Sequence, residues 1–181
     1  RPFMIWLTEI VFSLFGISEI SAHIVPGIFG IASAIFLYFF SLRLFKNRTA
    51  AFLAGFIFLT TPMMLWSMRS NMMDLPVGFF CMASIYSFWR AFNGNKRWWL
   101  AFGIFFGLAI MTKSVVGFLP VGLVGIWIIY EKRWDIFKEK FFWYGMVGSL
   151  FVFLPWHLIM TFKYGNLFWK DYYGYHVVSR F

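Results

Sequence analysis

Apolar residues run through this chain in long stretches, and short loops between them hold most of the charge. A helix of ~20 apolar residues is long enough to cross a lipid bilayer. The stretch 98–130 is too long for one crossing and carries Lys113 near its midpoint, so it predicts two short spans joined at 112–114. The pattern then predicts six crossings, at 22–45, 50–66, 75–92, the two halves of 98–130, and 141–161.

The first 15 residues are too short to cross a bilayer, and Thr8 and Glu9 interrupt their apolar run. Their apolar side chains nevertheless recur at helical spacing, as at Leu7, Val11 and Leu14. This pattern predicts an amphipathic helix that lies in the membrane interface.

Two further segments are expected outside the bilayer. In the turn before the first crossing, Ser18 or Ser21 can cap the helix that follows. The segment 163–181 is polar and rich in aromatic residues, and it cannot span a membrane. His176 and Arg180 stand four residues apart in it, so on a helix they share one face.

Composition decides the class of protein. Hydrophobic residues make up 61% of the chain and charged residues 13%, whereas a soluble domain keeps about a quarter of its residues charged. We therefore predict an all-α, polytopic transmembrane bundle that contacts membrane lipids. The net charge of +9 lies in short loops and not along a basic stripe on a soluble scaffold, so no nucleic-acid partner is expected. The single cysteine, Cys81, excludes a disulfide framework and a thiolate metal site.

The loops alternate in charge. Ten of the 16 basic residues fall in the loops on one side of the predicted membrane, namely Arg43, Lys46, Arg48, Arg90, Lys96, Arg97, Lys132, Arg133, Lys138 and Lys140. The positive-inside rule makes this side cytoplasmic. The other side, which then faces outward, holds Arg1, Arg69, Lys113, Lys163, Lys170 and Arg180.

The outward charges are the candidate functional residues. A charge inside the hydrocarbon costs about 2.5–3.5 kcal/mol and usually marks a site or a partner. Lys113 can be a cation for an anionic headgroup, or it can extend its ammonium group to the interface without further function. Arg69 and Asp74 can pair with each other across one helix turn, which is compatible with a role in binding. Together with Arg1, these residues predict a charged pocket that binds the phosphate of a lipid.

Other chemistry finds no support in the sequence. There is no glycine-rich phosphate loop, HExxH motif, nucleophile elbow or zinc-ligand spacing, which argues against a nucleotide-sugar or ATP site. Glu9 and Glu19 are expected to be solvated or interfacial carboxylates. His23 is expected to cap a helix or lie in the interface, and His157 to be packed and hydrogen-bonded in the last crossing.

Five stretches in the same order resemble motifs of the GT-C membrane glycosyltransferases, in the branch of bacterial aminoarabinose transferases and protein O-mannosyltransferases. They are RPFMIWL, LFGISEISAHIVPGIFG, RLFKNRTAAFLAGFIFLTTPMMLWSMRSNMMD, GLAIMTKSVVGFLP and PWHLIMTFKYGNLFWKDYYGYHVVSRF. The resemblance covers essentially the whole chain. Departures from the family pattern are Phe3 in place of a proline, His23 in place of an arginine and Ser114 in place of a glycine.

The resemblance implies a hexosyl- or pentosyltransferase that moves a sugar, with inversion, from a polyprenyl-phosphate donor to a lipid, protein or glycan acceptor. Its active site would face the periplasm or exterior from the cell's inner membrane. The chain begins without a methionine, and we expect residues 1–181 to be part of one transmembrane catalytic module. The first span, the first outer loop with the acidic base, and the C-terminal region would then lie outside it.

Roles carry over by position. Arg1 and Arg180 would hold the donor phosphate, with Lys113 and Arg69 as further candidates. Asp74 matches an acidic residue that lines the cavity. His176 falls where some members place a metal ligand, so the resemblance leaves a divalent metal open as a cofactor.

Two other classes of protein remain at this point. A transporter or lipid flippase would show inverted repeats and a helix broken at mid-membrane. The chain has no internal repeat, although Gly117, Pro120 and Gly122 could break a helix. A structural membrane subunit would leave the single outward charges unexplained.

Overall fold

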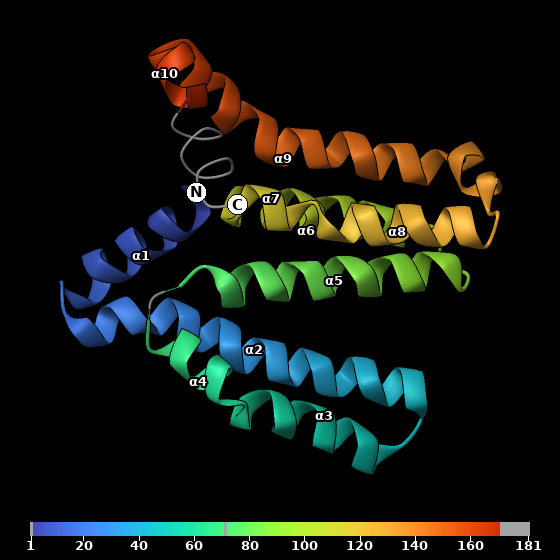
Figure 1. The fold of residues 1–181 in the computed structure, drawn as a ribbon, viewed down its shortest axis with the longest axis horizontal. Coiled ribbons are helices and arrows are strands. Elements are labelled where there is room, and N and C mark those ends of the chain that lie inside the picture. The colour runs from blue at the N-terminus through green and yellow to red at the C-terminus, as the bar shows by residue number, and fades with distance from the viewer. Residues whose placement is uncertain (1, 71, 171–181) are drawn as a thin grey trace.

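The computed structural model describes residues 2–70 and 72–170, and all regular structure within these residues is helical. Figure 1 shows helices that run back and forth along a common direction. The prediction of an all-α bundle is therefore confirmed.

The chain starts with two helices joined by a tight turn. α1 spans Pro2–Phe15 and α2 spans Glu19–Phe45, and the two pack against each other. Ser18 is the N-cap of α2: its hydroxyl accepts from the backbone N–H of Ser21, while the Ser21 hydroxyl accepts from the backbone N–H of Ser18. This reciprocal capping box satisfies two backbone donors that the helix itself leaves free. Both serines thus act in the cap.

The predicted crossing at 50–66 is broken, which the sequence pattern did not indicate. α3 spans Arg48–Thr60 and α4 spans Pro62–Met68, and their axes differ by 60°. Thr61 between them is extended, with φ −63° and ψ 122°. Pro62 accounts for the bend, because a proline disfavours helical backbone at the residue before it and contributes no N–H.

The long apolar run divides at the predicted place. α5 spans Asp74–Phe92, and α6 follows over Trp98–Thr112. Lys113 is extended, with φ −149° and ψ 98°. The chain then forms the short α7 (Ser114–Gly117) and, after a turn at Phe118, α8 (Leu119–Tyr130).

The final part contains one long helix between two short elements. The 3-10 helix η1 (Trp134–Lys138) leads into α9 (Lys140–Tyr164), and α10 (Asn166–Trp169) follows. Gly165 joins the last two helices at φ 54°, a backbone conformation that glycine adopts without steric cost.

The connections gather at the two ends of the bundle (Figure 1). We call the end with the α2–α3, α5–α6 and α8–α9 connections the basic end, because the ten basic residues predicted on the cytoplasmic side lie in or beside these loops. The opposite end holds the α4–α5 and α6–α7 connections, and we call it the site end. α6 packs between α5 and α9, while α2 packs against α3 and α5.

Fewer helices are long enough to span a membrane than the six crossings that the sequence predicts. Among the described residues, α2 and α9 are long and apolar enough to cross a membrane, and the bent α3–α4 pair would make a third span. α6 and the α7–α8 stretch are apolar but shorter. The number of crossings stays a prediction.

Candidate functional site

An ion pair joins two predicted site residues that are far apart in the sequence. The Lys113 Nζ donates to Asp74 Oδ1 over 2.6 Å. Their side chains are 34% and 47% exposed, so the pair lies at the surface of the site end and a ligand can reach it. The structure thus brings together two of the six candidate site residues.

Helix ends place both charges. Asp74 lies in the first turn of α5, and Lys113 follows the last residue of α6, which runs the opposite way. A carboxylate is favoured at a helix N-terminus and a cation at a C-terminus, because each opposes the partial charge of the helix dipole there. The antiparallel packing of α5 and α6 brings these two termini to the same end of the bundle.

The break at Lys113 is held by close packing of α7. The Lys113 carbonyl accepts from the Gly117 N–H over 2.7 Å, which closes one helical turn directly after the break. A Cβ at Gly117 would come within 2.6 Å of the Ile110 backbone nitrogen, so only glycine lets α7 pack this tightly on α6. The Cys81 thiol also lies 3.8 Å from the Val116 carbonyl oxygen and ties α7 to α5.

An apolar cluster between α5 and α6, close along both helices to Asp74 and Lys113, anchors the start of α1. The buried side chains of the cluster come from α5 and α6, and aromatic rings of α1 and α2 pack against them. Phe3 of α1 lies edge-on to Phe80 of α5 at 5.3 Å and to Phe29 of α2 at 6.4 Å. The first turn of α1 is therefore anchored less than two helical turns along α5 from Asp74.

Arg69 lies in the connection before α5 and does not pair with Asp74, so the local pairing considered from the sequence does not form. It is exposed and ends α4, and among the described residues its guanidinium makes no ion pair. Asp74 is satisfied by Lys113 instead. Arg69 is thus a cation of the site end without a carboxylate partner in the described part of the chain.

An open groove of about 590 Å³ runs beside the site along α1. Its walls are mainly apolar, with Glu9, Thr8 and Ser13 as the polar exceptions. Met73, the residue directly before Asp74, forms part of the lining, so the groove reaches the ion pair's helix. An apolar channel next to exposed charge suits an amphipathic lipid.

Three predicted site residues, Arg1, Arg180 and His176, lie outside the described residues. Their assigned roles therefore remain predictions. Pro2, the neighbour of Arg1, is buried at the start of α1.

No cluster of three or more histidine, cysteine or acidic side chains suited to a metal lies within 2–70 and 72–170. His157 is buried in α9, and its Nδ1 lies 2.8 Å from the Phe153 carbonyl oxygen, as expected of a packed, hydrogen-bonded histidine. His23 lies in the first turns of α2 but does not cap it, because Ser18 does.

The site's supporting glycines were not among the predicted site residues. Gly117 was considered only as a helix breaker. Gly103 and Gly107 of α6 stand four residues apart and pack on Gly145 and Ser149 of α9. The small-xxx-small spacing was the signal that could have identified them, because it is typical of helices that pack closely in membranes.

Known proteins match this chain over nearly its whole length. It is 27% identical, over 97% of its length, to the undecaprenyl phosphate-alpha-4-amino-4-deoxy-L-arabinose arabinosyl transferase of Erwinia tasmaniensis, and 25% identical over 97% to that of Enterobacter sp.. It spans about a third of those relatives, 32% of each. The crystal structure of ArnT from Cupriavidus metallidurans in the apo state superposes with a TM-score of 0.77, covering 97% of this chain and 33% of that one at 23% identity, which shows a shared fold.

A family model agrees with these relatives. The model described as dolichyl-phosphate-mannose-protein mannosyltransferase matches residues 1–159, and this range includes the Asp74–Lys113 pair and the break that positions it. The chain belongs to the dolichyl-phosphate-mannose-protein mannosyltransferase family.

Proposed function

We propose that this chain forms part of a membrane glycosyltransferase that moves a sugar from a polyprenyl-phosphate donor to an acceptor outside the cytoplasm. The observation that supports this most directly is the Asp74–Lys113 pair. Two segments 39 residues apart place it at one end of the bundle, beside an apolar groove.

The charges suit a phosphate that leaves with the polyprenyl chain. When the sugar–oxygen bond breaks, negative charge gathers on the phosphate, and fixed cations lower the energy of that state. Lys113 and Arg69 offer two positive charges at the site end, beside the carboxylate of Asp74. Arg1 and Arg180 would add to this set, as the family resemblance implies.

Asp74 fits the role of a positioning residue for Lys113. Its Oδ1 accepts from the ammonium group at 2.6 Å, which holds Lys113 in place. We assign the base to the acidic residue expected upstream of Arg1, as the family resemblance implies. The assignment leaves Lys113 fixed where a phosphate oxygen can approach its remaining protons.

The groove along α1 is the proposed seat for the start of the polyprenyl chain. An isoprenoid tail needs apolar walls, and its phosphate needs the charged rim that Met73 adjoins. The donor would thus lie with its tail along α1 and its headgroup at the start of α5.

Orientation and partners follow from the charge pattern and the relatives. The basic end would face the cytoplasm of the inner membrane, and the site end the periplasm or exterior. The names of the relatives favour undecaprenyl phosphate-linked aminoarabinose as the donor. The acceptor would be lipid A, a protein or an envelope glycan.

The alternative of a transporter or flippase has no support from the comparisons, since the relatives quoted above are named as transferases.

Replacing the proposed phosphate-binding cations in the full-length enzyme tests the function. Lys113→Ala should lower kcat/KM for transfer from a labelled polyprenyl-phosphate sugar by about 10-fold to 100-fold, because a charge-assisted hydrogen bond contributes about 1.5–3 kcal/mol. Arg1→Ala and Arg180→Ala should abolish transfer while the proteins still reach the membrane.

Lys163→Ala is the matched control. Lys163 is a lysine in the last turn of α9, and its ammonium lies 5.4 Å from the Tyr164 ring centre instead of against a carboxylate. Its loss should change transfer by less than about twofold. Activity near the wild-type level in Arg1→Ala, Arg180→Ala and Lys113→Ala would refute the phosphate assignment.

A further inference from the structure

A second pocket lies at the basic end, at the other end of α5 from the Asp74–Lys113 pair. Its volume is about 280 Å³, and it is lined by Trp89, Arg90, Asn93 and Asn95. We call it the Arg90 pocket. Pockets that enclose whole small molecules start at about 300 Å³, so its size suits a headgroup and not an entire lipid.

Arg90 is held in this pocket by an aromatic ring and not by a carboxylate of the described residues. Its guanidinium carbon lies 5.1 Å from the centre of the Trp98 ring, a cation–π arrangement that limits its motion. The side chain is half-buried, and among the described residues no carboxylate lies within ion-pair distance of it. Arg90 is therefore a preorganised cation with no carboxylate partner in the part of the chain that the structure describes.

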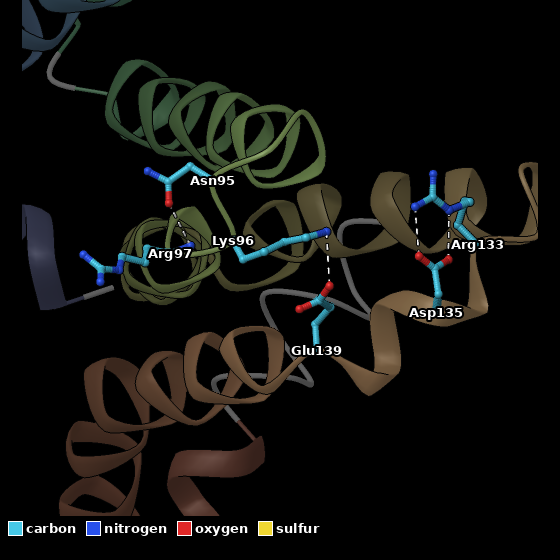
Figure 2. Close-up of polar contacts among 6 residues, drawn as sticks. All are labelled: Asn95, Lys96, Arg97, Arg133, Asp135 and Glu139. Atoms are coloured by element: carbon cyan, nitrogen blue, oxygen red, sulfur yellow. Dashed lines mark hydrogen bonds and ion pairs between the residues drawn. The ribbon is translucent and has the colours of Figure 1, made fainter.

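Two other basic residues of this end are paired with carboxylates. Lys96 pairs with Glu139 at 3.2 Å, and Arg133 forms two hydrogen bonds of 2.8 Å to Asp135 (Figure 2). The hydrogen bonds from Arg133 hold the pKa of the Asp135 carboxyl below its ordinary value. Glu139 and Asp135 thus neutralise Lys96 and Arg133, and neither of them pairs with Arg90.

The two asparagines make the pocket rich in donors. Asn93 Nδ2 donates to the Trp89 carbonyl over 2.8 Å, while Asn95 Oδ1 accepts from the Arg97 N–H over 3.2 Å (Figure 2 shows the latter bond). The Asn95 Nδ2 group has no partner among the described residues, so it adds a free donor beside Arg90. A guanidinium and an amide N–H that line one pocket, with no carboxylate in its lining, match the oxygens of a phosphate.

The aromatic residues around the pocket indicate its level in the membrane. Trp98 lies against Tyr86 at 5.6 Å, and Tyr86 lies 6.0 Å from Trp89. Tryptophan and tyrosine gather at the level of lipid headgroups, and basic pockets between helices at that level bind anionic headgroups. We propose that the Arg90 pocket binds the phosphate group of an anionic membrane lipid, separately from the donor site.

Lipid titration of the purified full-length protein in detergent tests this proposal. Phosphatidylglycerol and phosphatidylcholine are added separately, and bound lipid is counted by native mass spectrometry. Arg90→Gln should raise the Kd for phosphatidylglycerol by about tenfold. Arg97→Gln removes the same charge from an exposed side chain at the same end, and it should raise this Kd by less than about twofold.

Arg90→Lys keeps the charge, and it is the variant to measure if Arg90→Gln fails to fold. It should still raise the Kd several-fold, because lysine lacks the planar fork that both stacks on Trp98 and binds phosphate. Equal weakening by Arg90→Gln and Arg97→Gln, or equal affinity for phosphatidylcholine, would overturn the proposal. In a separate arm without lipid, saturable and Arg90-dependent binding of inorganic phosphate would assign the pocket to a soluble phosphate and would overturn the lipid assignment.

Discussion

Gly103 of α6 lies directly against the backbone of Gly145 of α9. A Cβ atom at Gly103 would overlap the Gly145 carbonyl oxygen, and a Cβ at Gly145 would overlap the Trp99 carbonyl oxygen. Without side chains between them, the two backbones approach closely, which is how helices gain packing energy within a lipid bilayer. This contact fixes α9 on α6, and α6 in turn carries Lys113 after its last residue.

Replacing Gly145 with alanine should loosen this contact. The added methyl group meets rigid backbone, so helix α9 must move, and overpacking of this kind costs about 1–3 kcal/mol. The measurement is the midpoint of thermal unfolding of the full-length protein in detergent, which should fall for Gly145→Ala.

Gly148 on the same helix provides the control. A Cβ there has open space within 4 Å, and alanine favours helix over glycine by about 0.5–1 kcal/mol. Gly148→Ala should therefore leave the midpoint unchanged or raise it. A drop as large as that of Gly145→Ala would show that the backbone contact is not what stabilises the pair.

A second glycine tests the link between packing and the site. Gly117→Ala should push α7 away from the Ile110 backbone and shift the extended residue Lys113. Because a displacement of about 1 Å at a reacting group can cost about 100-fold in rate, transfer activity should fall at least tenfold. Sugar transfer by membranes that hold the full-length variant measures this.

Gly122→Ala on α8 is the matched comparison, since a Cβ at Gly122 meets nothing within 4 Å. This variant should transfer sugar at the wild-type rate. If Gly117→Ala also keeps full activity while remaining folded, then the position of Lys113 does not matter for catalysis.

The sequence predicted those features that depend on neighbouring residues. The break at Lys113 followed from the length of the run 98–130 and from a charge near its midpoint. A serine cap, by Ser18 or Ser21, followed from residue type, and the structure uses both. The bend at Thr61 was missed, because the apolar length of 50–66 matched a single span and outweighed Pro62 near its end.

The Asp74–Lys113 ion pair could not be predicted from residues that are close in the sequence. Arg69, five residues from Asp74, was the obvious candidate partner, whereas Lys113 lies 39 residues away. What selects Lys113 is tertiary structure: α5 and α6 pack antiparallel, and opposite helix termini meet at the site end. A sequence shows which residues carry charge, but the packing of helices decides which charges meet.

The role of Asp74 can be separated from that of Lys113 by a double-mutant cycle. The variants are Asp74→Asn, Lys113→Gln and the two combined, all in the full-length enzyme, and the readouts are kcat and the KM for the lipid donor. An ion pair this exposed contributes about 0–1 kcal/mol to folding, so all three variants should unfold within a few degrees of the wild type. If Asp74 acts by holding Lys113 toward the phosphate, Asp74→Asn raises the KM for the lipid donor, whereas Asp74→Glu keeps this KM close to the wild-type value. The double variant is then no worse than Lys113→Gln alone. Losses that multiply in the double variant would instead mean that Asp74 contacts the substrates itself, and the carboxylate would have to be counted as a catalytic residue.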